Sequence, residues 1–146
     1  MILLDTTILV YAVGADHQLR APCRDMIGLI GGGRLAATTT VEAIQEFAHV
    51  RARRRGRTDA RRLAASFVDL LGPLVQPDAD DLAAGLGLFE RHDELGAFDG
   101  VLAAAVLRRP HLTALASADQ AFADIDGLLH LDPAQPDFLR SATADR

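Results

Sequence analysis

The 146-residue chain contains no lysine and no tryptophan, and Cys23 is its only cysteine. Without lysine there is no phosphate-binding loop of the Walker A type and no Schiff-base chemistry. A single cysteine excludes a disulfide framework and a cysteine-rich metal site. The five histidines lack the HExxH spacing of the helical zinc site. The chemistry of this chain is therefore expected to depend on oxygen-bearing and basic side chains.

Long hydrophobic runs are also missing. No apolar segment approaches the roughly 20 residues that a membrane-spanning helix needs, and the N-terminus lacks the basic start of a secretory signal. Hydrophobic residues make up 49% of the chain, which is too many for a disordered protein, and aromatic residues only 5%. We therefore expect one cytoplasmic domain with an aliphatic core and no membrane contact, in which residues 1–131 are folded and 132–146 form a polar C-terminal tail.

The net charge is −5, but the arginines are unevenly distributed. Residues 51–62 (RARRRGRTDARR) contain seven arginines and one acid, which gives this segment a local charge of +6. Such a run is typical of a strip that binds phosphates. It is equally typical of a solvated helix face, and the sequence leaves both interpretations open.

Short apolar segments alternate with amphipathic ones, which predicts an α/β fold with a mostly parallel sheet covered on both faces. The expected strands are residues 2–5, 35–37, 74–76, 112–116 and 128–131. The expected helices are residues 18–30, 40–55, 58–71, 78–91, 98–109 and 119–125. Thr39 or Thr40 is expected to cap the second of these helices, and Thr58 the third. In such a sheet, functional sites lie at the carboxyl ends of the strands.

A carboxylate interrupts the apolar N-terminal segment MILLDTTILVYA. An unpaired buried charge is costly, so Asp5 either caps nearby groups or serves a cation. Asp99 and Asp119 likewise lie where a predicted helix begins. All three aspartates are expected at one edge of the sheet, because they stand where a strand ends or a helix starts.

The predicted helix 40–55 adds two glutamates, Glu42 and Glu46, which lie one turn apart on one face. At 100° per residue, the apolar face of this helix consists of Val41, Ile44 and Ala48. The stripe of the two glutamates continues through His49 and Arg53. Helical geometry does not distinguish the two glutamates from each other.

Acids gathered at one edge of the sheet imply a cation. Two carboxylates in close contact repel by roughly 4 kcal/mol at an effective dielectric constant of 20, so either some of them are protonated or a cation lies among them. Oxygen ligands favour a hard ion, with Mg²⁺ first and Mn²⁺ as the alternative.

Four motifs, in their order and spacing, resemble the PIN domain, and most closely the VapC-type ribonuclease toxins of bacterial toxin–antitoxin pairs. They are residues 2–11 (ILLDTTILVY), Glu46-Phe47, residues 95–99 (LGAFD) with 102–105 (LAAA), and residues 115–119 (LASAD) with Phe122. The likeness extends from residue 2 to about residue 131. It implies a PIN-like three-layer αβα sandwich with a central, mostly parallel sheet of four to five short strands.

The resemblance also implies a function and a site. The protein would be an Mg²⁺-dependent endoribonuclease that hydrolyses RNA with a metal-activated water, with a small cognate antitoxin and a homodimeric state. The metal-binding and catalytic acids would be Asp5, Glu46, Asp99 and Asp119. Candidates to support these acids or to contact the substrate are Thr6, Glu42, Ser117 and Arg53. The family often has Asn at the position of Thr7 and Thr at the position of Ser117.

Two other functions stay open. A degenerate PIN domain would bind RNA or a partner protein without cleaving, although the presence of all four acids argues against it. A metal-dependent phosphatase of the haloacid-dehalogenase type would need a second Asp where Thr7 stands. The scarcity of aromatic residues argues against base stacking on aromatic rings as the main grip on RNA.

Overall fold

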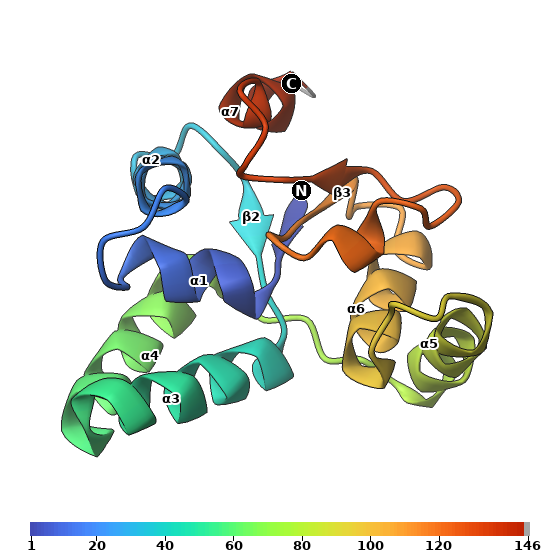
Figure 1. The fold of residues 1–146 in the computed structure, drawn as a ribbon, viewed down its shortest axis with the longest axis horizontal. Coiled ribbons are helices and arrows are strands. Elements are labelled where there is room, and N and C mark those ends of the chain that lie inside the picture. The colour runs from blue at the N-terminus through green and yellow to red at the C-terminus, as the bar shows by residue number, and fades with distance from the viewer. Residues whose placement is uncertain (145–146) are drawn as a thin grey trace.

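The computed structural model describes residues 1–144, in which a small sheet lies between two groups of helices (Figure 1). The strands are β1 (Ile2–Leu4), β2 (Ala37–Thr38), β3 (Ala114–Ala116) and β4 (His130–Leu131). The helices are α1 (Thr6–Ala12), α2 (Arg20–Gly31), α3 (Val41–Arg55), α4 (Arg57–Leu71), α5 (Ala79–Arg91), α6 (Ala97–Leu107) and α7 (Phe138–Thr143), with a short 3₁₀ helix η1 (Gln120–Phe122). This arrangement confirms the predicted three-layer sandwich with four short strands.

All four strands are parallel and follow the order β2-β1-β3-β4. The pairing continues past the strand ends, since the Asp5 N–H donates to the Ala116 carbonyl at 2.9 Å and the Ser117 N–H to the Leu131 carbonyl at 3.1 Å. Because the strands run in one direction, the residues that follow β1 and β3 emerge at the same edge of the sheet.

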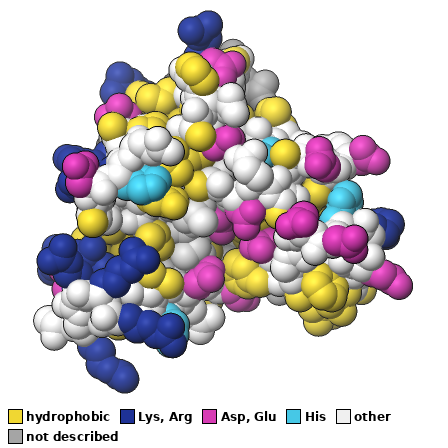
Figure 2. All heavy atoms as spheres, viewed as in Figure 1, with side chains coloured by type: hydrophobic (Ala, Val, Ile, Leu, Met, Phe, Trp, Pro, Cys, Tyr) yellow, Lys and Arg dark blue, Asp and Glu magenta, His cyan; other side chains and the backbone are white. Residues whose placement is uncertain are grey.

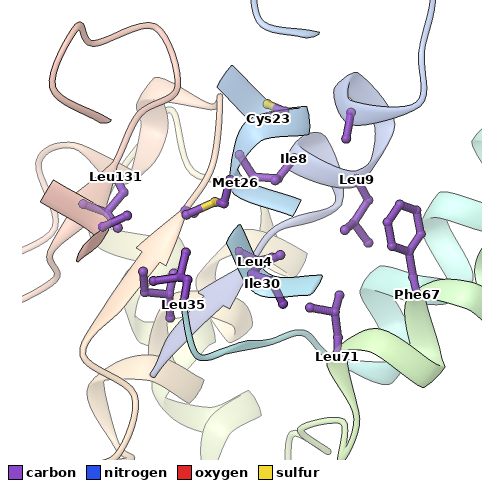
Figure 3. Close-up of a cluster of buried hydrophobic side chains, with 14 of the residues drawn as sticks. Leu4, Ile8, Leu9, Cys23, Met26, Ile30, Leu35, Phe67, Leu71 and Leu131 are labelled. Atoms are coloured by element: carbon purple, nitrogen blue, oxygen red, sulfur yellow. The ribbon is translucent and has the colours of Figure 1, made fainter. Parts of the chain in front are cut away.

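The two faces of β1 belong to two separate cores, because successive side chains of a strand point to opposite faces. Ile2 and Leu4 belong to a core that includes buried side chains from α1, α2 and α4, and Figure 3 shows this cluster around Leu4. Leu3 belongs to the other core, with Leu102 of α6 and Phe122 of η1. The sheet therefore separates the helices that carry different parts of the site.

Helices α5 and α6 approach each other closely at two glycines. A Cβ atom on Gly85 would lie 2.5 Å from the backbone nitrogen of Val101, and a Cβ atom on Gly100 would collide with the Gly85 carbonyl oxygen. A side chain at either position would push the helices apart. This contact holds the first turn of α6, which carries Asp99, at a fixed position against α5.

A buried ion pair joins the first turn of α5 to the end of α6. Asp81 is fully buried and accepts hydrogen bonds from Nη2 and Nη1 of Arg109, at 2.6 and 2.9 Å, and from Nε of Arg108 at 3.0 Å. Asp81 also completes a capping box with Asp78 at the start of α5. The hydrogen bond from Arg109 is the largest cause that lowers the pKa of Asp81, to about 2.

Two segments near the sheet differ from the sequence-based prediction. Residues 6–12, for which no helix was expected, form α1, because Asp5 caps their first turn. Residues 74–76, expected as a strand, make only one parallel bridge, between Val75 and Thr40. Prolines at 73 and 77 flank this segment and carry no N–H donor, which limits strand pairing here.

The turn between α3 and α4 consists of a single residue, Gly56, whose φ of 87° favours glycine. Helix α4 begins at Arg57, so Thr58 does not cap it. At the other end of α3, Thr40 is the cap, and its hydroxyl accepts from the Ala43 N–H at 3.0 Å.

Residues 132–144 include a helix that packs against α2 and β4, rather than forming only the expected polar tail. They contain α7, whose Phe138 and Ala142 are buried in the first core. The last two residues of the expected tail, Asp145 and Arg146, lie outside the described residues. Among the helices of residues 1–144, none combines the length and the apolar composition that crossing a bilayer requires.

Candidate active site

Four acidic side chains from separate parts of the chain line one hollow of about 350 Å³. Asp5 follows β1, Glu46 lies on α3, Asp99 lies in the first turn of α6, and Asp119 directly precedes η1. Figure 2 shows acidic side chains gathered near the centre of this face of the molecule. The structure thus brings together all four acids that the sequence motifs single out.

Asp5 is 3% exposed, and hydrogen bonds from four donors satisfy its carboxylate. Oδ1 accepts from the Thr6 N–H at 2.6 Å, and Oδ2 accepts from the hydroxyls of Thr7 and Ser117, both at 2.7 Å, and from the Thr7 N–H at 3.4 Å. Asp5 therefore caps α1, which is one of the two roles that the sequence left open. A carboxylate has about four acceptor positions, so Oδ1 retains a lone pair for a cation as well.

Ser117 links the end of β1 to the turn that carries Asp119. Its hydroxyl donates to Asp5 and accepts from the Asp119 N–H at 3.0 Å. Thr7 strengthens the link, because its hydroxyl accepts from the Ala118 N–H at 3.0 Å. Ser117 thus supports two of the acids, as expected, and Thr7 shares this role although no role was assigned to it from the sequence.

Thr6 holds the glutamate of the site. Its Oγ1 donates to Oε2 of Glu46 at 2.6 Å, across a sequence separation of 40 residues. The Thr6 side chain is buried, whereas Glu46 is exposed. The hydroxyl therefore fixes the direction of a carboxylate that solvent would otherwise leave free to rotate.

The surroundings raise the pKa of Asp99 to about 6. Burial is the largest cause, and the negative charges of Asp5, Asp119 and Glu46 add to it, whereas a hydrogen bond from the Gly96 backbone lowers the pKa. The acids are therefore close enough to repel one another. A cation among them would relieve this repulsion.

The donor set of the hollow fits a hard divalent cation. It offers carboxylate and hydroxyl oxygens, and none of the residues that line it is a histidine or cysteine. Within residues 1–144, no three acidic, histidine or cysteine side chains are already placed as a complete ligand set. Repelling carboxylates are expected to close around an ion only when it is bound, with water completing its coordination.

Glu42 does not share the hollow with the four acids. It lines a separate hollow with Phe98 and Leu102, and its Oε2 is buried without a hydrogen-bond partner among the described residues. Glu42 is also absent from the charges that raise the pKa of Asp99. The structure therefore separates the two glutamates that helical periodicity could not distinguish.

Arg54, rather than Arg53, lies beside the acids. Arg54 lines the acidic hollow together with Glu46 and Val50, whereas Arg53 lines a groove between α3 and α4. The expectation that Arg53 faces the acids is not met. Residues 46, 50 and 54 repeat every four positions, and this spacing is the sequence signal that would have identified Arg54.

The sequence matches the family model of the PIN domain over residues 2–128. The chain belongs to the PIN-domain family. This PIN domain is 51% identical over 134 residues to Ribonuclease VapC7 of Mycobacterium tuberculosis (strain ATCC 25618 / H37Rv), an alignment that covers 91% of the chain and 92% of that protein. It is 34% identical over 125 residues to Ribonuclease VapC23 of the same strain, covering 84% and 96%.

The PIN fold also matches solved structures. A chain of the crystal structure of VapBC2 from Rickettsia felis, bound to a DNA fragment from their promoter, superimposes with a TM-score of 0.68 at 15% sequence identity, covering 90% of this PIN domain and 98% of that chain. At this identity the similarity establishes the shared fold. The relatives confirm the expected likeness to VapC ribonucleases, which are generally dependent on a divalent metal.

Proposed function

We propose that the protein is a divalent-metal-dependent endoribonuclease and the toxin component of a bacterial type II toxin–antitoxin pair. The observation that carries this proposal is the hollow lined by Asp5, Glu46, Asp99 and Asp119, in which burial and then the charges of the other three acids raise the pKa of Asp99. The identity of 51% to Ribonuclease VapC7 along nearly the whole chain supports the same activity.

The proposed ion is Mg²⁺, with Mn²⁺ as the alternative, held by the four acids. When bound, it would supply a Lewis acid for the phosphate and lower the pKa of a water molecule. Thr6 fixes the direction of Glu46, and Ser117 and Thr7 hold Asp5 in place. Arg54, at the side of the hollow, provides a positive charge for an RNA phosphate.

The two other candidate functions have less support. In the phosphatase alternative, position 7 would carry a second aspartate, but here the Thr7 hydroxyl donates to Asp5. In the non-cleaving alternative, four mutually repelling acids would be a cost without a function, because RNA phosphates are themselves negatively charged.

The proposed partners are an RNA substrate and a small antitoxin protein. The fold shared with a chain of VapBC2 from Rickettsia felis supports the antitoxin, and we expect a homodimer from the family resemblance. The proposed place of action is the cytoplasm, where RNA is available.

The experiment is a cleavage assay of the purified protein on single-stranded RNA with Mg²⁺, with Mn²⁺ and with EDTA. The matched variant is Asp99→Asn, because removing one of the repelling charges keeps the side-chain shape and is expected to maintain or raise the unfolding temperature. We expect cleavage only with the divalent ion and only in the wild type.

Each other outcome is decisive. Cleavage that persists in EDTA or in Asp99→Asn contradicts the metal-dependent mechanism. RNA binding without cleavage in either ion supports the degenerate PIN domain. Hydrolysis of p-nitrophenyl phosphate in place of RNA supports the phosphatase.

A further inference from the structure

Beside the acidic hollow lies a second hollow that the proposed reaction does not use. It has a volume of about 300 Å³ and lies between the end of α1 and the second half of α3. Its lining combines the apolar side chains of Val10, Val13, Phe47 and Val50 with three arginines. We call it the apolar hollow.

The two hollows share part of their lining. Val10, Val50 and Arg54 contribute to both. The apolar hollow is therefore within reach of a nucleotide next to a phosphodiester held at the acids.

Three arginines line the apolar hollow, and two of them are available to a ligand. Arg51 is engaged, since its Nε donates to Asp59 at 2.6 Å and its Nη1 to the Val13 carbonyl at 2.8 Å. Arg54 and Arg55 are exposed and form no ion pair with a carboxylate of residues 1–144. Figure 2 shows a basic patch at the lower left, with apolar side chains between it and the central acids.

We infer that the apolar hollow binds a nucleobase of the RNA, next to the phosphate that is cleaved at the four acids. This inference rests on the proposed ribonuclease function. Bases of single-stranded RNA can be splayed out and stacked on the planes of arginine guanidinium groups. Phe47 is fully buried and closes the hollow from inside, so Arg54 and Arg55 supply the stacking surface and the contacts to phosphate.

The charge and polarity of the apolar hollow match a nucleotide. Its inner wall includes the apolar Phe47, its lining carries Arg54 and Arg55, which form no ion pair within residues 1–144, and it adjoins the acids where a phosphate would be held. A ligand with an apolar, planar part attached to a chain of negative charges fits these three features together. A protein segment would need acidic side chains opposite Arg54 and Arg55.

The test fills the apolar hollow without changing a residue of the acidic hollow. Ala15 lines the apolar hollow and is exposed, so Ala15→Trp is expected to fold normally, with Ala15→Leu as a smaller filling variant. The matched control is Ala65→Trp, an equally exposed alanine in the groove between α3 and α4. Thermal unfolding checks that all three variants keep the wild-type stability.

The probes are fluorescein-labelled pentaribonucleotides of each single base and an abasic ribose–phosphate pentamer. Their affinities are measured by fluorescence anisotropy in EDTA, where no cleavage occurs. We expect the wild type to bind at least one base-containing probe about fivefold or more tightly than the abasic probe, equivalent to about 1 kcal/mol, because only a probe with a base can fill the apolar hollow and stack on the arginines. In Ala15→Trp this ratio is expected to fall to nearly one, whereas Ala65→Trp keeps it.

Two results overturn the inference: a ratio near one in the wild type, and a ratio that is the same in Ala15→Trp and in the wild type. The second would leave the apolar hollow as a docking position for a protein segment. Because binding is measured without a divalent ion, the result is independent of cleavage. If the wild type binds a base-containing probe more tightly than the abasic probe but never cleaves RNA, the proposed ribonuclease function is refuted and the inference of a base-binding hollow is retained.

Discussion

The hydroxyl of Thr6 donates a hydrogen bond of 2.6 Å to the carboxylate of Glu46, and this contact joins α1 to α3 beside the acidic hollow. Thr6 lies directly after Asp5, so one short segment supplies an acid of the site and orients a second one. A hydrogen bond to a carboxylate is stronger than one between neutral groups. Thr6 is thus a positioning residue, which acts on the reaction through Glu46.

Replacing Thr6 by valine tests this role, because valine keeps the branched shape and lacks the donor. We expect Thr6→Val to raise the divalent-ion concentration for half-maximal cleavage by roughly 10-fold or more, the usual effect of losing a partner of a metal ligand. Thr6→Ser keeps the hydroxyl, so its half-maximal ion concentration should be close to that of the wild type. The free energy of unfolding should fall by only about 1 kcal/mol. An unchanged ion dependence in Thr6→Val would show that Glu46 needs no such support.

The two glutamates of α3 give a matched pair of variants. Glu46→Gln removes a charge from the acidic hollow and should lower kcat/KM for RNA by roughly 100-fold or more, equivalent to about 2.7 kcal/mol of transition-state stabilisation. Glu42→Gln changes a residue of a different hollow and should leave cleavage near the wild-type rate. Equal losses in the two variants would contradict the assignment of Glu46.

Neighbouring arginines on α3 give a second matched pair. Arg54→Gln should weaken RNA binding and lower the slope of log affinity against log salt concentration by about 0.7 for each phosphate of a single strand that the variant no longer neutralises. Arg53→Gln should leave the slope unchanged, because Arg53 lines the groove between α3 and α4. Affinities measured in EDTA at several salt concentrations give both slopes. Equal slopes of log affinity against log salt concentration for the wild type and Arg54→Gln would show that Arg54 is a solvated side chain that does not contact RNA phosphates.

The buried pair of Asp81 and Arg109 predicts a pH dependence of stability. The folded state lowers the pKa of Asp81 to about 2 from its ordinary value of 3.8, so the pair stabilises the protein above about pH 4. This contribution, about 2 kcal/mol, is lost as the pH falls from 4 toward 2. Asp81→Asn should therefore lower the free energy of unfolding at pH 7, and the difference from the wild type should shrink below pH 4.

Urea unfolding at a series of pH values measures this difference. A constant gap between Asp81→Asn and the wild type from pH 7 to pH 3 would show that the ion pair does not cause it. The cleavage rate at neutral pH should be close to that of the wild type in conditions where both proteins are folded, since Asp81 lies outside the acidic hollow.

The edge position of the acids could be predicted from the sequence, because it follows from parallel strands alone. Asp5 and Asp119 lie just beyond β1 and β3, and the strands run in one direction. The family resemblance then singled out Glu46, and its place in the hollow agrees with this choice. Thr6 and Ser117 were expected to support the acids or to contact the substrate. Their hydrogen-bond partners could not be predicted, because side-chain partners depend on tertiary packing.

The rotation of α3 about its axis could not be predicted in the same way. The expected apolar face was Val41, Ile44 and Ala48, but the residues buried on α3 are Ala43, Ile44 and Phe47. Phe47 enters the core against Phe67 of α4, with ring centroids 5.0 Å apart. Successive residues of a helix differ by 100° in direction, so placing the apolar face correctly is needed before one can say which of two neighbouring arginines faces the acids.

Helix α1 was not predicted from the sequence because the residues of its first turn do not favour a helix. Thr6, Thr7 and Ile8 are β-branched, and such residues have reduced helix propensity. The decisive signal was Asp5, which is a strong N-cap residue, and burial of Ile8 and Leu9 in the first core holds the helix in place. A cap and burial in the core therefore override the propensity of the first turn.

The hydrogen bond between Asp5 and Ser117 spans 112 residues of sequence, and this separation orders events during synthesis. A ribosome makes Asp5 among the first residues and Ser117 only near the end, so β1 has no β3 to pair with for most of translation. Asp119 follows Ser117, and α7, which completes the first core, comes later still. A nascent chain therefore holds no assembled acidic hollow, and a chain truncated before residue 117 never acquires one. The acids of this ribonuclease therefore come together only when most of the chain has been made.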